Sequence, residues 1–267
     1  MDQLCFTPAQ VAENLTETIC VKKAKAPFTY LLVLGILAGA FIGFGGMIST
    51  LAGVGTADTL GYGLSKILSG SVFSVGLMLV VIGGAELFTG NNLILLSALN
   101  KTIPWSALFR NWIIVFIANF IGSVLVAWLY WQTKLWVATP TYDIGAAAMK
   151  IAVTKAGLDF WPALFRGILC NWLVCMAVWL AAASKEVIGK VLGIFFPIMT
   201  FVALGFEHSI ANMYFIPLGI FLGAEVTWGK FLIGNLLPVT IGNIIGGAFF
   251  VGFMYWVAYV RKAKKAA

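Results

Sequence analysis

Long apolar runs separated by short polar segments dominate the chain. Six of these runs are long enough to cross a bilayer as helices, which takes about 20 residues each. The predicted spans cover residues 27–51, 65–96, 105–132, 161–183, 191–222 and 231–260. The segment between the third and fourth spans, which contains Pro140 and Lys155, is predicted to be a loop. The pattern indicates an all-α polytopic membrane protein with six transmembrane helices.

The start of the chain is amphipathic and not uniformly apolar. Apolar residues recur at helical spacing between Phe6 and Lys25, and Thr7-Pro8 is a typical cap followed by a first-turn proline. We therefore predict an N-terminal amphipathic helix (1–26) on the cytoplasmic membrane surface. A six-helix transmembrane domain (27–260) and a basic cytoplasmic tail (261–267) follow it.

Two of the spans are interrupted by polar residues in nearly the same order. The interruptions are Gly84–Asn91 (GAELFTGN) and Gly205–Asn212 (GFEHSIAN), and both read Gly-x-Glu-x-x-x-x-Asn. Ionisable side chains at bilayer depth are costly, and they mark pathways or cavities. Interruptions at matching places in two halves indicate a transport site between repeats. We predict that helices 2 and 5 are broken at these positions.

The repeat extends into the third and sixth spans. The pattern Asn-x7-Asn-x2-Gly occurs at Asn111–Gly122 and again at Asn235–Gly246. Because each half has an odd number of spans, the second half must be inverted relative to the first. We predict two inverted three-helix repeats, at about residues 27–133 and 161–260, around an axis in the membrane plane.

Composition and charge narrow the class further. Of the 267 residues, 61% are hydrophobic and 10% are charged, which excludes a soluble globular domain. The net charge of +7 does not indicate a nucleic-acid partner, because the basic residues lie in loops between the spans. Ten of them lie in the loops on one side and five on the other, which places both termini in the cytoplasm of a multi-pass inner-membrane protein. No zinc spacing, Walker motif or Ser-His-Asp arrangement occurs, so we expect no metal, no cofactor and no enzyme.

His208 is the only histidine, and it lies within the second interruption. Its charge can change near physiological pH, so we predict that it meets a permeating anion or gives it a proton. Thr89 and Asn171 are predicted to line the same pore, because hydroxyl and amide groups orient a partly dehydrated anion. The alternative for these two residues is hydrogen bonding between helices, and for Asn171 it is equally well supported.

The remaining polar residues of the interruptions have predicted structural roles. Glu86 and Glu207 are expected to accept hydrogen bonds from unwound backbone amides, although Glu207 could instead be a second pore group. Asn91 and Asn212 are expected to cap the helices that restart there. Lys155, on the outer side, either attracts anions or is a solvated loop residue.

Bulky apolar residues flank these polar groups: Leu87, Phe88, Phe73 and Phe201. Such residues form a narrow, dry gate, which repels ions but admits a neutral molecule. This suggests that a weak-acid anion is attracted, is protonated at the centre, and crosses as the neutral acid. Plain packing is the alternative for each phenylalanine.

These motifs resemble those of the formate/nitrite transporter family over essentially the whole chain. Gly84–Thr89 is similar to the family's loop that interrupts helix 2, and Gly205–Met213 to its break in helix 5. The resemblance implies a homopentamer of aquaporin-like subunits in membrane lipid. It also implies that His208 and Thr89 form a central site.

The same resemblance assigns the other site residues. It makes Asn171 the pore asparagine and Lys155 the outer lysine. Leu87 and Phe88 then belong to the cytoplasmic constriction, and Phe73 and Phe201 to the outer one. Members of this family pass small weak-acid anions. We expect formate to be the substrate and its passage to be coupled to protons. Hydrosulfide or nitrite is the alternative substrate, and a pore for neutral solutes is less favoured.

Overall fold

The computed structural model describes residues 5–139 and 142–261, and within those ranges it contains helices and no strands. The all-α prediction is therefore confirmed. Residues 1–4, 140–141 and 262–267 lie outside the described part, so Pro140 and nearly all of the predicted basic tail are not placed.

Five of the described helices are long and apolar enough to cross a membrane. They are α3 (Phe28–Gly53), α5 (Tyr62–Val81), α7 (Trp105–Thr133), α9 (Phe160–Ala183) and the continuous run Lys230–Val260. That run is made of η3 (Lys230–Leu236), α12 (Leu237–Ile244), η4 (Ile245–Phe253) and η5 (Trp256–Val260). Apolar stripes remain exposed on these helices, as at Ile113, Ile117 and Ile121 of α7, which suits a lipid or protein environment and not water.

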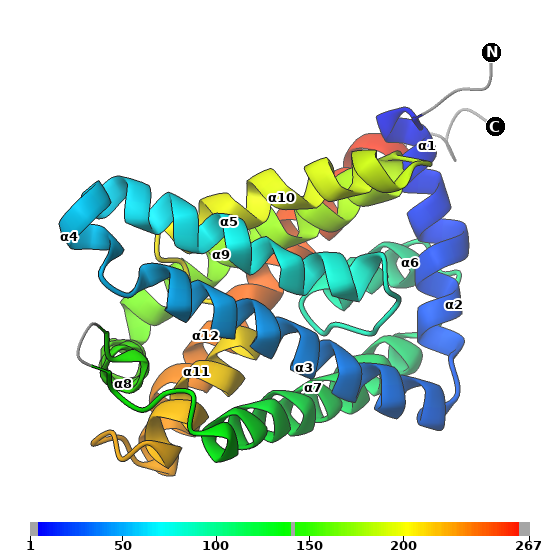
Figure 1. Cartoon of the computed structure of the whole chain (residues 1–267). Helices are drawn as coiled ribbons and strands as arrows, with labels where there is room; N and C mark the ends of the chain where they lie inside the picture. The colour runs from blue at the N-terminus through cyan, green and yellow to red at the C-terminus, as the bar shows by residue number, and fades with distance from the viewer. Residues whose placement is uncertain (1–4, 140–141, 262–267) are drawn as a thin grey trace.

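The N-terminal segment is a helical rod that crosses one end of the bundle (Figure 1). It consists of α1 (Pro8–Asn14), η1 (Leu15–Ile19) and α2 (Cys20–Lys25). The predicted start is confirmed, because the Gln10 N–H donates to Thr7 Oγ1 and the Thr7 N–H donates to Gln10 Oε1, a complete capping box. One face of the rod is buried in the protein, including Val11 and Leu15. Its position on a membrane surface stays a prediction.

The segment predicted as a loop between the third and fourth spans contains a helix, so that prediction was wrong. This helix, α8 (Ile144–Ala156), is capped by Asp143, whose Oδ1 accepts from the Ala146 N–H at 2.7 Å. Small residues at four-residue intervals form the buried face of α8. This face lies close to α11, because a Cβ added to Gly219 of α11 would overlap the Ala152 side chain. Its apolar stripe is built from alanines, which carry a weaker periodic signal than larger residues do. A second short helix, α4 (Thr56–Leu60), was not predicted either.

Two irregular segments separate shorter helices from the long ones. After α5 ends at Val81, the chain resumes helical structure in η2 (Gly90–Ile94) and α6 (Leu95–Leu99). Similarly, α10 (Val187–Ala203) is followed by α11 (Ser209–Phe221). Gly84 (φ 87°) and Gly205 (φ 72°) take the left-handed conformation in these two segments, which a residue with a Cβ adopts only with strain.

The helices around these segments pack in the same way in both halves. α3 packs against α5 and α7, and α9 packs against α10 and α12. A Cβ on Gly122 of α7 would overlap the Ile36 carbonyl, and a Cβ on Gly246 of η4 would overlap the Ile168 carbonyl. The glycines that end the two Asn-x7-Asn-x2-Gly patterns therefore allow equivalent close contacts between helices, one in each half.

Substitution of Gly246 by alanine is expected to destabilise the protein by about 1–3 kcal/mol or more, because the added methyl has no space without moving the backbone. The matched control is Gly234→Ala in the same helical run. Its Cβ would meet nothing closer than Lys230 Cγ at 3.7 Å. Thermal unfolding in detergent should show a lower midpoint for the first variant only. Equal midpoints would contradict the close contact.

Candidate functional site

The centre of the site is a hydrogen bond between two residues that are 119 positions apart. Thr89 Oγ1 and His208 Nε2 lie 2.9 Å from each other, and both residues are buried. The Ala211 N–H donates to His208 Nδ1 at 3.1 Å, so this ring caps α11. Since Nδ1 accepts, the neutral ring carries its proton on Nε2 and donates it to Thr89. The threonine hydroxyl then keeps its own hydrogen for another acceptor.

The backbone of the first irregular segment is held by one asparagine of α7. Asn119 Nδ2 donates to the Gly35 and Glu86 carbonyls at 2.7 and 2.9 Å. Its Oδ1 accepts from the Phe88 N–H at 2.9 Å. All of these groups are deep in the protein, where an unpaired backbone group would cost about 1–3 kcal/mol. Asn119 therefore supplies the hydrogen bonds that Glu86 and Phe88 would have made in a continuous helix, and it also contacts α3 through the Gly35 carbonyl.

Asn243 of α12 does the same for the second segment. Its Nδ2 donates to the Gly167 and Glu207 carbonyls at 2.8 and 2.9 Å, and its Oδ1 accepts from the Ser209 N–H at 2.8 Å. The three contacts reproduce those of Asn119, group for group. The two irregular segments are thus built on one plan.

Glu86 and three residues near it form a polar cluster, which we call the first clamp: Lys23, Glu86, Asn91 and Asn111. Lys23 Nζ lies 2.9 Å from Glu86 Oε1, and Asn91 Nδ2 donates to Glu86 Oε2 at 2.8 Å. Asn91 Nδ2 also donates to Asn111 Oδ1 at 2.9 Å, and Asn111 Nδ2 donates to the Lys23 carbonyl at 3.0 Å. These contacts close a ring that joins α2, the irregular segment, η2 and α7.

The second clamp has the same composition in the other half. Lys155 Nζ lies 2.9 Å from Glu207 Oε1, and Asn212 Nδ2 donates to Glu207 Oε2 at 2.7 Å. Asn212 Nδ2 also donates to Asn235 Oδ1 at 2.8 Å, and Asn235 Nδ2 donates to the Lys155 carbonyl at 2.8 Å. Each buried carboxylate is thereby paired with one ammonium and one amide, as burial of a charge requires.

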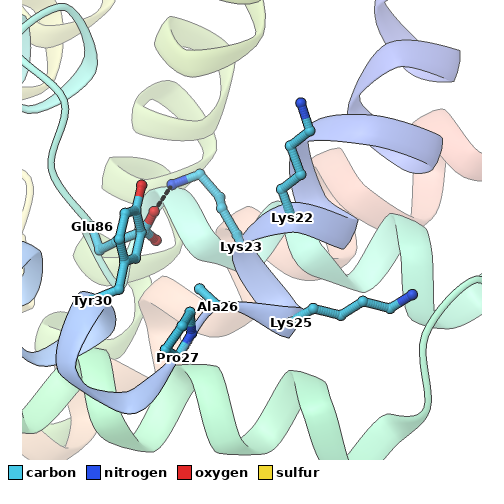
Figure 2. A pocket seen from close by; sticks show the side chains of 7 residues that line it. All are labelled: Lys22, Lys23, Lys25, Ala26, Pro27, Tyr30 and Glu86. Atoms are coloured by element: carbon cyan, nitrogen blue, oxygen red, sulfur yellow. Dashed lines mark hydrogen bonds and ion pairs between the residues drawn. The ribbon is translucent and has the colours of Figure 1, made fainter.

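The first clamp is reached from outside through a cavity of about 350 Å³. Figure 2 shows that Lys23 points toward Glu86, whereas Lys22 and Lys25 point away from it. The Lys23 side chain is 28% exposed and that of Glu86 only 4%. A solute in the cavity therefore meets the ammonium group first.

These contacts correct two predictions. The two glutamates do not hold unwound backbone amides; the partners of their carboxylates in the described chain are a lysine and an asparagine side chain. Nor do Asn91 and Asn212 cap the restarting helices: both bind a glutamate, and His208 is the cap of α11.

Lys155 is not a solvated loop residue. It lies in the last turn of α8, and its ammonium group pairs with Glu207. The carboxylate neutralises much of the charge that was expected to act on solutes in the outer mouth. The side chain still keeps 17% of its surface exposed.

The amide nitrogen of Asn171 is occupied by the protein. It lies 3.2 Å from the Thr89 carbonyl, 2.9 Å from Asn92 Oδ1 and 2.7 Å from the Asn243 carbonyl. An amide group has two hydrogens, so three acceptors already compete for them. These contacts support the alternative interpretation, hydrogen bonding between helices. Oδ1 has a contact within the protein as well, the Cys175 Sγ at 4.0 Å.

The predicted apolar residues are all buried around the central hydrogen bond. Phe201 stacks beside the His208 ring with centroids 5.9 Å apart, and Phe73 meets Phe201 edge-on at 5.7 Å. Phe88 packs against other aromatic rings, including Phe116 at 4.9 Å. Leu87 is 2% exposed. The structure thus brings Phe73 and Phe201 together at the histidine.

Sequence reasoning missed Lys23 as a site residue and left the repeated asparagines of α7, η3 and α12 without a role. A signal was present: Lys-x11-Gly occurs at Lys23–Gly35 and again at Lys155–Gly167. Searched together with the Asn-x7-Asn-x2-Gly repeat, this pattern predicts that the two lysines are equivalent. Charge counting alone treats Lys23 as one of the basic residues that orient the spans and gives no sign of its buried partner.

Comparison with known proteins agrees with this geometry. The family described as formate/nitrite transporter matches residues 9–257, a range that includes both irregular segments and both clamps. The chain is 46% identical to a probable formate transporter of Methanothermobacter thermautotrophicus, over 96% of this chain and 98% of the relative. It is 36% identical to the formate channel FocA of Escherichia coli K12, over 96% and 95%.

Solved structures agree as well. A pentameric formate channel with formate bound is 36% identical, superposes with a TM-score of 0.80, and is matched over 90% of this chain and 99% of its own. Likeness in sequence and in fold therefore extends over nearly the whole molecule. This chain belongs to the formate/nitrite transporter family of membrane proteins.

Proposed function

We propose that the protein is a channel for a small monovalent weak-acid anion, with formate as the principal substrate. The observation that carries this proposal is the buried Thr89–His208 hydrogen bond, where the two irregular segments meet. The Thr89 hydroxyl accepts from the histidine and keeps its own hydrogen to donate, and aromatic side chains lie beside the ring, which suits a small anion with few hydration waters. The relatives described as a formate channel and a probable formate transporter support formate over hydrosulfide or nitrite.

The architecture that fits this function has six spans in two inverted repeats. In it, α5 with η2 and α6 forms one broken span, and α10 with α11 forms the other. The matching contacts of Asn119 and Asn243 support this arrangement. We further propose a homopentamer in the inner membrane with cytoplasmic termini, the assembly named for the solved relative. Residues 1–26 then form a cytoplasmic helix before a channel domain of residues 27–260.

Proton transfer at His208 requires a definite sequence of steps. The neutral ring cannot give up its Nε2 proton to a weak acid's anion, so it must first take up a proton at Nδ1. That uptake breaks the hydrogen bond from the Ala211 N–H. The Nε2 proton then passes to the anion, which leaves as the neutral acid. The ring is then neutral with its proton on Nδ1, and it must exchange this proton for one on Nε2 before the Ala211 N–H can donate to Nδ1 again. Protonation of the substrate is thereby coupled to the cap of α11.

The apolar residues act as gates on both sides of this centre. Leu87 and Phe88 form the cytoplasmic constriction and Phe73 and Phe201 the outer one, so a bare ion meets a desolvation cost that the neutral acid avoids. Lys155 supplies weaker attraction at the outer mouth than an unpaired lysine would.

The function is tested by flux into sealed proteoliposomes that contain the full chain. Formate, nitrite, hydrosulfide and glycerol are compared at pH 7 and pH 5. We expect saturable passage of formate that is faster at the lower pH, and no passage of glycerol. Glycerol flux without anion flux would overturn the proposal in favour of a neutral-solute pore.

Thr89→Val is expected to lower formate flux at least tenfold, because the isosteric side chain leaves both His208 Nε2–H and the anion without their partner. The loss of a hydrogen-bonding group in a buried polar site costs about 1–3 kcal/mol. The control is Thr200→Val, whose hydroxyl donates to the Phe196 carbonyl on an exposed face of α10. Equal flux in both variants would remove Thr89 from the site.

A further inference from the structure

The two clamps are alike in composition, and they also involve equivalent helices. Lys23 lies in the last turn of α2, which precedes α3; Lys155 lies in the last turn of α8, which precedes α9. Carbonyls in the last turn of a helix have no partner within that helix. In both clamps, an asparagine side chain donates to the carbonyl of the lysine itself. The repeated unit is therefore a short helix followed by three spans.

One side chain in each clamp connects the short helix to the irregular segment. Asn111 contacts the Lys23 carbonyl through Nδ2 and Asn91 through Oδ1. Asn111 is fully buried, and neither contact involves His208 or Thr89. Asn111 therefore acts on the Lys23–Glu86 pair from both ends: it holds the backbone of the lysine and the amide that orients the carboxylate. Asn235 does this for the other pair.

The clamps lie at opposite ends of the molecule. Figure 1 shows α2 at one end of the bundle and α8 at the other. Each lysine side chain is partly exposed, whereas each glutamate side chain is buried. An anion that enters from either end thus meets one lysine, whose position is set by the clamp of that end only.

We propose that Asn111 and Asn235 are positioning residues, each of which sets the affinity for anions at one end of the pathway only. The inference rests on the proposed anion channel. Without its asparagine, the lysine backbone and the carboxylate are no longer held together, and the ammonium group spends more time away from the pathway. The half-saturating anion concentration then rises at that end, by about threefold for an ion pair that is partly exposed.

The test compares Asn111→Leu and Asn235→Leu in the full-length protein, in vesicles of both orientations. Initial rates of formate entry are measured against concentration, from each side separately. We expect the half-saturating concentration of Asn111→Leu to rise at the end that bears the N-terminal helix and to stay unchanged at the other. Asn235→Leu should show the mirror image, so each variant is the matched control of the other.

Changes at both ends in each variant, or at neither, would overturn the inference. If a leucine variant fails to assemble, Asn111→Ser and Asn235→Ser replace it, since a hydroxyl is small and polar but too short to reach both partners. The wild type separates the two proposals. If the wild type shows no formate flux, the channel proposal is rejected. If the wild type shows flux but the half-saturating concentrations of the variants do not differ between the two sides, only the positioning role is rejected.

Discussion

His208→Phe is expected to remove the pH dependence of formate flux while the protein still assembles. Phenylalanine occupies a similar volume and can stack on Phe201, but it neither donates to Thr89 nor takes up a proton. The ratio of formate flux at pH 5 to that at pH 7, which exceeds one in the proposed wild type, should fall to about one after the small effect of free formic acid crossing the lipid is subtracted. Total flux should fall at least tenfold, because the centre of the pathway loses its charge-switching donor.

The fold should tolerate this change at a modest cost. The lost cap of α11 is worth about 1 kcal/mol, the typical value for an N-cap. His208→Asn is the matched control, since asparagine is a good N-cap and its amide can donate toward Thr89; it should retain assembly and more flux than the phenylalanine variant. A phenylalanine variant with the wild-type pH profile would show that His208 is not the group that senses protons.

Asn119→Leu and Asn243→Leu are expected to have the largest effects on stability of any single substitutions considered. Each removes the partner of two buried backbone groups that have no partner within a helix, a glutamate carbonyl and the N–H two residues later. At about 1–3 kcal/mol for each unpaired group, the loss of about 2–6 kcal/mol is a large part of the stability of a typical folded protein, about 5–15 kcal/mol. Neither variant should be recovered as a monodisperse assembly after extraction.

The control for this prediction is Asn14→Leu, a change of the same size on a partly exposed position of the N-terminal rod. Size-exclusion chromatography and thermal unfolding in the same detergent measure both. A native elution profile and midpoint for Asn119→Leu would mean that the irregular segment does not depend on this asparagine.

Much of the fold could be predicted from sequence because membrane spans carry strong signals. The ends of the first, third and fourth spans lie within two residues of α3, α7 and α9. The Thr7-Pro8 start and the positions of the two interruptions could be predicted because capping residues, glycines and charged residues within apolar runs each favour a narrow set of local structures. The pairing of Thr89 with His208 followed only from the family resemblance, since nothing local links residues so far apart.

Most of the errors share one cause. Sequence patterns describe which residues lie on a helix face, but not which partner a buried polar group finds across the fold. Glu86 was assigned to backbone amides because its partner Lys23 lies 63 positions away, before the first span. Asn91 has the residue type and position of a cap, yet a carboxylate within reach competes for its amide. α8 was missed because alanine and lysine do not distinguish a packed helix from a polar connection.

The presence of α8 changes what counts as a module in this protein. Cut before α9, the second half lacks Lys155, so Glu207 enters the membrane without its counter-charge. A chimera that exchanges halves between relatives must therefore place its junction between Thr133 and Asp143, ahead of the short helix. The short helix α8, which resembles a dispensable linker in the sequence, is the first element of the second half.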